Sequence, residues 1–379
     1  MGCCKNIIGS LVCIVILCGA GVVAYLYGPW NKENGGGAGG GDSEDTTTTL
    51  IGKSSDCENC CNGLESNCNR PINEVTWAMV HNAMSAEENS FYAANNDLSL
   101  EKALVAGYRG LMLDSCLCDG DTIVDIVTDY ISGNDNGEKS EEELYLGFCH
   151  GTCAAGERKP STVLNNIKTF LELNPNEVII LEFEVGEGSL EQLKQAVEES
   201  GLDKYAFRDV DTDGNVTKWP TFQELIDANQ RVLLFAHNGG MKHCSMVTCP
   251  EGFFYTYDHF SQTDWNDETC ELKGDDPYLA QNGFFLMNHW KNSRQNGLEL
   301  PSKSNAEEFN TYESISNRFG TCEQRLPNVV AVDFWSIGDL LEFVEDQNTN
   351  TASDGKENGK ENGKEDVVVA ESRSGSLRQ

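Results

Sequence analysis

The sequence predicts an α/β protein with a (β/α)8 TIM-type barrel, in which eight parallel strands alternate with helices. Eight short apolar runs are separated by stretches of helical periodicity, which is typical of this fold. The 379-residue chain is long enough for one such barrel. No glycine-rich dinucleotide loop follows the first apolar run, and this disfavours the runner-up, an open doubly wound sheet.

Each element is expected from its own local pattern. The apolar runs predict strands at residues 75–80, 109–114, 144–148, 178–184, 231–236, 253–257, 284–287 and 329–334. The helical patterns cover residues 98–106, 161–173, 189–199, 222–229, 306–318 and 337–346. Pro160 and Pro220, each followed by a Ser or Thr, mark two of the helix starts.

Composition divides the chain into four segments. Residues 1–30 contain an uncharged apolar stretch, 7–27, of the length that a transmembrane helix needs, about 20 residues. We therefore expect an N-terminal membrane anchor with a luminal or extracellular ectodomain; the alternative is a signal peptide whose cleavage releases a secreted protein. Residues 31–56 are a Gly- and Thr-rich flexible stalk, 57–348 the barrel, and 349–379 a disordered acidic and polar tail.

Charge and cysteine content restrict the function classes. A formal charge of −34 excludes nucleic acid as a partner, because the chain would repel phosphate backbones. The cysteines beyond residue 56 are dense and predict disulfides, since no pair of CxxC motifs has the spacing of the rival zinc site. Asn215 begins an N-glycosylation sequon. It lies within an EF-hand-like stretch that starts at Asp209, but Pro220 occupies the position of the last ligand, which favours an acidic turn.

Polar residues stand where the expected strands end. These residues are His81-Asn82, Asp114, His150, Glu184, His237-Asn238, Asp258-His259, Asn288-His289 and Asp333. In a barrel all strand ends of one kind meet on one face, where active sites of this fold lie. Polar residues also simply mark where strands leave the core, but that reading explains poorly why five of the six histidines fall there. The set suits general acid–base chemistry on a phosphate or ester.

Two other hydrolase classes fit the sequence less well. No GxSxG elbow is present, which disfavours a Ser-His-Asp hydrolase. A glycosidase that uses Asp114 and Glu184 stays open, but it would leave the histidines without a role.

The order of the motifs resembles a known family. "WAMVHNAMS", "AGYRGLMLDSC", "LGFCHGTC", "NPNEVIILEFE", "WPTFQELIDANQRVLLFAHN", "FFLMNHW" and "LPNVVAVDFW" follow one another across residues 57–348. Together they resemble the X-domain of phosphatidylinositol-specific phospholipase C, and in particular its single-domain plant and fungal forms. The resemblance implies a phosphoric diester hydrolase whose substrate is a membrane lipid, an inositol phospholipid or a glycosylated inositol anchor, or another related phosphodiester.

The resemblance also assigns roles to residues. His81 matches the general base that takes the proton of the inositol 2-hydroxyl, which attacks phosphorus to form a cyclic phosphate. His150 matches the general acid that protonates the departing diacylglycerol oxygen. Asn82, Asp114 and Glu184 match ligands of the calcium-dependent members, and we favour a weakened Ca²⁺ site. It is weakened because Met112 stands where the family has a further Glu, and a thioether is a poor ligand for a hard cation.

Further assignments complete the expected site. Candidate contacts to the substrate or its phosphate are Arg109, Arg158, Lys159, Asn288 and Asp333, although Arg109 fits a structural ion pair equally well. At least one disulfide should join the loop of Cys116 and Cys118 to that of Cys149 and Cys153. The alternative function is a catalytically silent barrel that binds a lipid head group or a protein, which Met112 favours.

Overall fold

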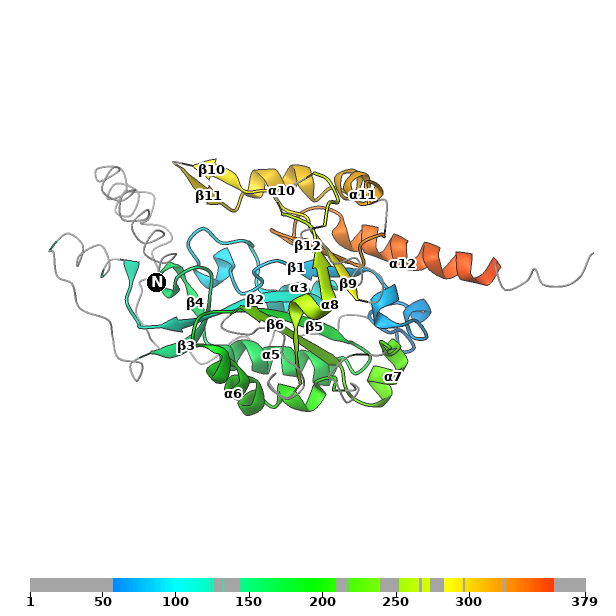
Figure 1. Cartoon of the computed structure of the whole chain (residues 1–379), viewed down its shortest axis with the longest axis horizontal. Helices are drawn as coiled ribbons and strands as arrows, with labels where there is room; N and C mark the ends of the chain where they lie inside the picture. Colours follow the sequence, from blue (N-terminus) through cyan, green and yellow to red (C-terminus); the bar gives the residue numbers. More distant parts are fainter. Residues whose placement is uncertain are drawn as a thin grey trace, which may run out of the picture.

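A curled sheet of eight parallel strands forms the centre of the protein (Figure 1). The computed structural model describes residues 57–357 except 124, 126–131, 133–143, 209–215, 217, 239–251, 266–267, 273–282, 296 and 323–324. The strand order is β7-β6-β5-β2-β1-β12-β9-β8, in which β7 and β8 are the two ends. These strands are β1 (Trp77–Val80), β2 (Gly110–Cys118), β5 (Ile179–Val185), β6 (Val232–Asn238), β7 (Phe253–Tyr255), β8 (Phe260–Gln262), β9 (Phe284–Asn288) and β12 (Val329–Val332).

Helices connect the strands and cover the outside of the sheet (Figure 1). They are α3 (Leu100–Ala106), α5 (Pro160–Leu173), α6 (Leu190–Ser200), α7 (Phe222–Asp227), α8 (Thr256–His259), α10 (Lys303–Phe309), α11 (Tyr312–Gly320) and α12 (Leu340–Glu357). Short 3-10 turns span Glu65–Asn67, Ile72–Glu74, Glu87–Asn89, Cys153–Ala155 and Leu202–Tyr205. A two-stranded hairpin, β10 (Ser293–Gln295) with β11 (Leu298–Leu300), stands apart from the main sheet. The predicted (β/α)8 fold class is confirmed.

Strand alternation separates two apolar cores. On β5, Ile179, Leu181 and Phe183 belong to the core between the sheet and the helices. Ile180, between them in sequence, belongs to the second core, inside the barrel. This period of two is what a strand buried on both faces requires. The interior is tight at Gly110, where a Cβ atom would lie 2.8 Å from the Cβ of Met79, so only glycine fits.

One predicted strand is not part of the barrel, and one barrel strand was not predicted. The run at 144–148 forms β3 (Tyr145–Cys149), but β3 pairs antiparallel with β2 and with β4 (Glu157–Arg158), so it is a hairpin extension rather than a barrel strand. The barrel strand β8 was not predicted, because it has only three residues and directly follows the one-turn helix α8. The helix expected at 306–318 is also interrupted at Asn310 and Thr311, which separate α10 from α11.

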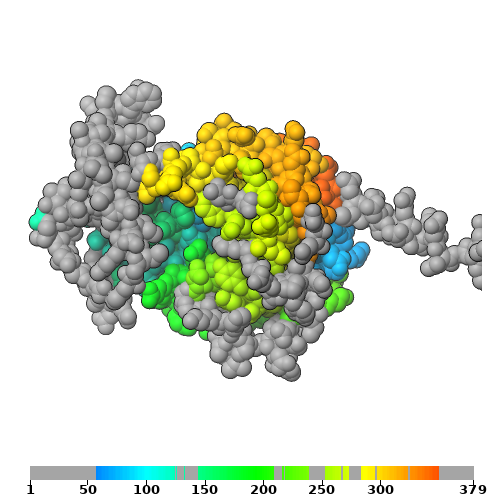
Figure 2. Space-filling view, turned by 45° about the horizontal axis from the view of Figure 1, so that its top comes forward, coloured from blue at the N-terminus to red at the C-terminus, as the bar shows by residue number. Residues whose placement is uncertain are grey.

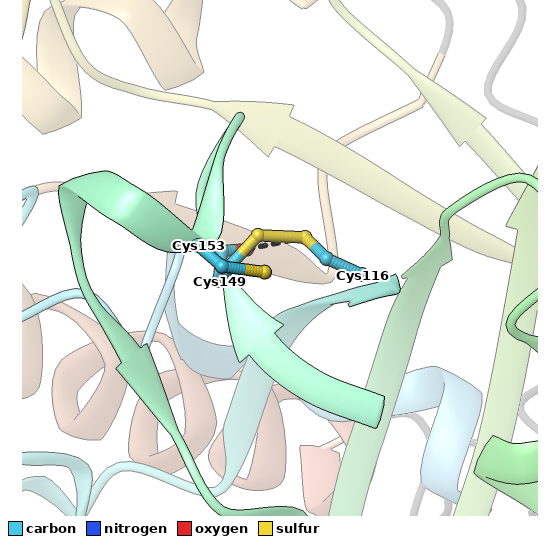
Figure 3. A group of neighbouring side chains, drawn as sticks. All are labelled: Cys116, Cys149 and Cys153. Carbon is cyan, nitrogen blue, oxygen red and sulfur yellow. Dashed lines mark hydrogen bonds between the residues drawn. A yellow bond between two sulfur atoms is a disulfide. The ribbon is translucent and has the colours of Figure 1, made fainter. Parts of the chain in front are cut away.

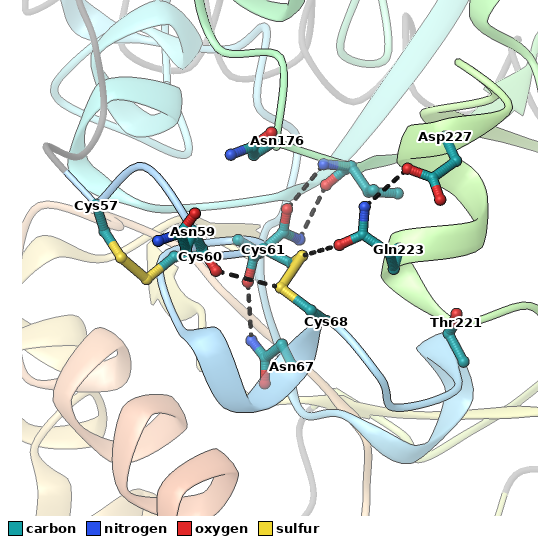
Figure 4. Close-up of a disulfide and its surroundings, with 12 residues drawn as sticks. Cys57, Asn59, Cys60, Cys61, Asn67, Cys68, Asn176, Thr221, Gln223 and Asp227 are labelled. Carbon is teal, nitrogen blue, oxygen red and sulfur yellow. Dashed lines mark hydrogen bonds between the residues drawn. A yellow bond between two sulfur atoms is a disulfide. The ribbon is translucent and has the colours of Figure 1, made fainter.

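Disulfides close the N-terminal end of the barrel. Cys57 is bonded to Cys60 and Cys61 to Cys68, and the loop that carries them lies beside α7 (Figure 4). Cys61 and Cys68 pack into the interior core. Asn62 ties this loop to the sheet, because its side chain accepts a hydrogen bond from the Val178 amide (2.7 Å) and donates one to the Val178 carbonyl (3.0 Å). Disulfide bonding, expected from the cysteine content, is present.

The membrane-anchored localisation expected from the sequence is contradicted. Within residues 57–357, as far as they are described, no helix is long and apolar enough to cross a membrane. The apolar stretch 7–27 and the stalk 31–56 lie outside the described residues, as do Asn215 and most of the EF-hand-like stretch. At the other end, α12 runs past residue 348 to Glu357, into the segment expected to be a tail.

Candidate active site

The residues at the open end of the barrel form a polar layer above an apolar interior. Along β1, β2, β5, β6, β9 and β12, alternate residues face the interior, and the last of each series is polar: His81, Asp114, Glu184, His237, Asn288 and Asp333. The apolar residues below them include Met79, Ile180, Phe235, Leu286 and Ala331. The parallel register places Asp114 beside Glu184, and Glu184 beside His237. Six of the predicted strand-end residues therefore lie together at the mouth of the barrel. His289 does not, because its ring bonds to the Phe309 carbonyl, and neither does His259, which packs against Trp219 and Phe254.

His81 is held by a carboxylate and by a ring. Its Nδ1 lies 2.7 Å from Asp333 Oδ1, and because a carboxylate only accepts, Nδ1 must carry the proton that it donates. Its imidazole stacks on the indole of Trp290 at 3.8 Å between ring centroids. In the neutral ring, protonation of Nδ1 leaves the lone pair on the other nitrogen, Nε2. Asp333 and Trp290 thus fix the orientation of the His81 ring.

His150 follows β3 and faces a second carboxylate. Its Nδ1 lies 3.0 Å from Asp114 Oδ2 and 3.0 Å from Asn82 Nδ2, and it serves one partner at a time. A protonated Nδ1 donates to Asp114; an unprotonated one accepts from Asn82. Neighbouring groups partly desolvate the ring, whose side chain is still 43% exposed, and this disfavours its charged form. The hydrogen bond and charge of Asp114, with the charges of Asp333 and Glu184, outweigh this effect and raise the pKa of His150.

A chain of hydrogen bonds joins the two histidines. Asn95 donates to Asp333 Oδ1 (3.1 Å), the oxygen that holds His81, and accepts from Asn82 Nδ2 (3.4 Å). Asn82 in turn contacts His150. Asn82 and Asn95 are both buried. The backbone of Asn82 is left-handed, with φ of 43°, a conformation that asparagine tolerates better than most residues.

Two disulfides hold the loop of His150 against β2. Cys116 is bonded to Cys149 (Figure 3). Cys118 is bonded to Cys153, so a bridged cysteine lies on each side of His150 in the sequence. Both join the two loops that the sequence led us to link. Since each closes a loop of more than 30 residues, with separations of 33 and 35, they limit the freedom of the unfolded chain and fix the hairpin that carries His150.

A buried ion pair, which the sequence analysis missed, lies next to this layer. His237 Nδ1 donates to Glu182 Oε1 at 2.5 Å, and Thr256 donates to the same oxygen at 3.2 Å. Burial lowers the pKa of the imidazole, but the charge and hydrogen bond of Glu182, with the charges of Glu184 and Asp114, raise it to about 9. His237 is therefore an imidazolium at neutral pH, and it brings a fixed positive charge beside Glu184.

The pH dependence of the free energy of unfolding should reveal the positive charge of His237. The folded-state pKa of His237, about 9, lies above its ordinary value of 6.5. The ion pair with Glu182 therefore stabilises the folded state fully below about pH 6.5, and this contribution is lost as the pH rises through 9. We expect wild type to lose up to about 3 kcal/mol more than His237→Asn between pH 6 and pH 10, measured by urea unfolding. Equal losses in both proteins would show that the pair does not form.

Three side chains at the barrel mouth carry oxygen atoms that could hold a calcium ion. Asp114 and Glu184 are oxygen donors on neighbouring strands, and burial together with the charge of Asp114 raises the pKa of Glu184. Asn82 adds an amide oxygen. Met112, one layer below, offers none, and its neighbour Glu182 is engaged by His237. The donors suit Ca²⁺ in kind, but they are fewer than its usual six to eight.

The predicted cationic helpers are not all at the site. Arg109 precedes β2 at the opposite end of the barrel, where Nε donates to Glu177 at 2.6 Å and both side chains are 6% exposed. Arg158 pairs with the buried Glu101 at 2.7 Å. Lys159 is exposed at the start of α5. Arg109 is therefore a structural ion-pair partner, the reading that the sequence left open.

Two further predicted residues lie in the polar layer. Asp333 orients His81, as described above. Asn288 donates to Gln262 Oε1 (3.1 Å) and to the Thr263 carbonyl (2.9 Å), while its own Oδ1 is buried without a partner in the described structure. Asn95 and Trp290 complete the site and were missed by the sequence analysis, because an asparagine in a loop and a tryptophan after a strand carry no distinctive pattern.

Comparison with known proteins agrees with the motifs. PI-PLC X domain-containing protein 1 of Arthroderma benhamiae is 27% identical over 291 residues, covering 74% of this chain and 87% of that protein. A PI-PLC X domain-containing protein of Arabidopsis thaliana is 24% identical over 294 residues, covering 71% of this chain and 60% of that protein. This chain thus spans less than two thirds of the plant protein.

Solved structures of bacterial enzymes are also similar. Phosphatidylinositol-specific phospholipase C from Listeria monocytogenes matches with a TM-score of 0.44 and 16% identity, covering 75% of this chain and 95% of that one. A mutant of the enzyme of the same name from Staphylococcus aureus matches with a TM-score of 0.46 and 12% identity, covering 74% and 93%.

The family itself is established by the sequence. The family model described as PI-PLC X 1 matches residues 130–348, more than half of the chain. That stretch contains His150, Glu184 and Asp333, whereas His81 and Asp114 precede it. The resemblance drawn from the motifs is confirmed, and the chain belongs to the PI-PLC X domain family.

Proposed function

We propose that this protein is a phosphoric diester hydrolase that cleaves an inositol phospholipid or a related phosphodiester through a cyclic phosphate. The observation that carries the proposal is the pair of contacts His81–Asp333 at 2.7 Å and His150–Asp114 at 3.0 Å, with Asn95 and Asn82 hydrogen-bonded to each other between them. It supports two imidazoles at one barrel mouth, each against its own carboxylate. In-line displacement at phosphorus needs such a pair, one group to take a proton and one to give it.

The chemistry divides between the two histidines. His81 Nε2 takes the proton of the inositol hydroxyl while that oxygen bonds to phosphorus. The bond from phosphorus to the glycerol oxygen breaks, and His150 gives its proton to that oxygen, releasing the glycerol lipid and leaving a cyclic phosphate. The raised pKa of His150 favours the acid role, because the ring stays protonated at higher pH than an ordinary imidazole.

Positive charge near the phosphate would stabilise the transition state. The imidazolium of His237 supplies one fixed charge beside Glu184. A calcium ion held by Asn82, Asp114 and Glu184 would supply a second by neutralising charge on the phosphate oxygens. Arg109 is excluded from this role by its pairing with Glu177.

Calcium binding should be weak, and substitution of Met112 should change its affinity. Two carboxylates and an amide predict a dissociation constant of about 10⁻⁴–10⁻³ M, in the weak range of protein Ca²⁺ sites. Met112→Glu adds a carboxylate next to Asp114 and should tighten Ca²⁺ binding at least about tenfold by titration calorimetry, whereas Glu184→Gln should abolish it. Met112→Gln, without the charge, is the control. If Met112→Glu and Met112→Gln bind Ca²⁺ equally, the ion does not bind here.

One observation favours a second function, a barrel that binds a head group without cleaving it. Met112 occupies an interior position of β2, and the adjacent carboxylate, Glu182, is neutralised by His237. Such a barrel would bind phosphatidylinositol vesicles in a manner dependent on His237 and release no product. Product formation by the purified protein, lost in His81→Ala, would decide for the hydrolase.

A further inference from the structure

The surface helices α10 and α11 are joined to the loop that carries Asp333. The orange α10–α11 segment lies at the surface, beside the yellow-green residues of the β7–β8 region (Figure 2). Asn310 directly follows α10, and the β12 loop, residues 333–339, runs from the end of β12 to the start of α12. The amide of Asp339 donates to the Asn310 carbonyl at 2.8 Å, and its carboxylate accepts from the Tyr312 amide at 3.0 Å. The junction between α10 and α11 is thus bonded directly to the β12 loop.

The side chain of Asn310 reaches the backbone of this loop. Asn310 is 1% exposed, and its Nδ2 donates to the carbonyl of Asp333 at 2.8 Å and to that of Ile337 at 3.3 Å. The two segments approach closely, because a Cβ atom on Gly338, whose φ is 87°, would lie 2.1 Å from the Asn310 carbonyl oxygen. Both N–H bonds of one buried amide are therefore used on the β12 loop.

The peptide group between Asp333 and Phe334 is held at both of its polar ends. Its carbonyl accepts from Asn310, and its N–H, which belongs to Phe334, donates to the Asn95 carbonyl at 2.8 Å. Through its side chain, Asn95 also donates to Asp333 Oδ1 at 3.1 Å. One partner precedes α3 and the other follows α10, so two separate segments fix the plane of this peptide and the direction of the Asp333 side chain.

Phe334 has a backbone conformation that its own side chain disfavours. Its φ is 48°, in the left-handed region, where a bulky residue is an outlier. Such a conformation persists only where the surrounding structure imposes it. The bonds from Asn310 and to Asn95 impose it here, because they hold the peptide that precedes the Phe334 Cα atom. Without them, rotation to negative φ would turn this peptide and move the carboxylate that lies 2.7 Å from His81 Nδ1.

We propose that Asn310 is a positioning residue for His81. By holding the peptide between Asp333 and Phe334 in its strained orientation, Asn310 keeps the Asp333 carboxylate directed at His81 Nδ1. The Nε2 atom of the neutral ring then keeps the lone pair that takes the substrate proton. The last step rests on the proposed function, in which His81 is the base, whereas the control of the His81–Asp333 hydrogen bond by Asn310 does not.

The direct test observes the proton between His81 Nδ1 and Asp333. It is followed by NMR of the full chain with ¹⁵N-labelled histidine at one fixed pH, and it is assigned by its loss in Asp333→Ala. We expect Asn310→Ala and Asn310→Leu to move this resonance upfield or to broaden it, because the hydrogen bond lengthens. Asn310→Leu keeps the volume of the side chain without its N–H groups, so the test does not depend on one substitution that folds poorly.

Asp339→Ala is the matched control. It removes the acceptor of the Tyr312 amide from the same junction, but it leaves the bonds to the peptide between Asp333 and Phe334 in place. It should therefore lower the free energy of unfolding in urea and keep the wild-type resonance. On phosphatidylinositol, Asn310→Ala should lower kcat at least about tenfold with KM unchanged, because a displaced base slows proton transfer without changing substrate binding. Asp339→Ala should keep both constants.

The outcomes separate this inference from the proposed function. A wild-type resonance in both Asn310 variants would overturn the inference, as would full kcat in Asn310→Ala. An equal change in Asp339→Ala would also overturn it, since any loosening of the junction would then have the same effect. A shifted resonance in the Asn310 variants of a protein that releases no cyclic phosphate would confirm that Asn310 positions His81 and refute only the hydrolase.

Discussion

His81→Ala and His150→Ala should each lower turnover of phosphatidylinositol at least about 10²-fold, the usual loss when a positioned proton-transfer group is removed. His81 is oriented by Asp333 at 2.7 Å and His150 by Asp114 at 3.0 Å, so neither has a substitute in the hydrogen-bonded chain. Initial rates on labelled vesicles, with circular dichroism to verify folding, measure the effect.

A substrate with a good leaving group separates the two roles. Such a group needs no proton, so the substrate should partly rescue His150→Ala and do little for His81→Ala, whose missing step is activation of the attacking hydroxyl. Equal rescue of both variants would contradict the assignment of base and acid. Near-normal activity of either variant on the natural lipid would remove that histidine from the mechanism.

Glu177→Leu should destabilise the protein by about 3–5 kcal/mol, because it leaves the guanidinium of Arg109 buried without a counter-charge. The Arg109–Glu177 pair is 6% exposed on both sides, and Arg109 also donates to the carbonyls of Leu104 and Tyr108, so the charge cannot move into water. Urea unfolding measures the loss.

The matched control is a more exposed ion pair of the same fold. Lys102 and Glu88 are 2.6 Å apart with side chains about one third exposed, and Lys102→Met should cost only about 0.2–1 kcal/mol. Below its unfolding transition, Glu177→Leu should keep wild-type kcat/KM, since the pair lies at the far end of the barrel. A large loss of kcat/KM with unchanged stability would instead indicate that Arg109 contacts the phosphate of the substrate.

The fold could be predicted because strands and helices alternate in their local patterns, but strand pairing could not. The run at β3 is as apolar as a barrel strand, and only its antiparallel pairing with β2 shows that it is a hairpin. That pairing depends on residues more than 25 positions apart, such as Cys116 and Gly147. β8 was missed because three residues are too few to show a period.

The sequence predicted those site residues that stand at the carboxyl ends of strands. His81, His150 and Asp114 lie where the strands open onto one face, as expected. For Arg109 the sequence left two readings open. It begins the strand that Asp114 ends, so it lies at the opposite end of the barrel, where it pairs with Glu177. The Glu182–His237 pair was missed, although Glu182 is two residues before Glu184 and therefore on the same face of β5.

The most direct test of the account is ³¹P NMR of phosphatidylinositol vesicles incubated with the purified protein, first with Ca²⁺ and then with a chelator. The account predicts that the phosphodiester signal is replaced by that of a five-membered cyclic inositol phosphate, and that His81→Ala and His150→Ala leave the lipid intact. Vesicles that bind wild-type protein but keep their phosphodiester signal under both conditions would contradict it, and the barrel would then be a binding module.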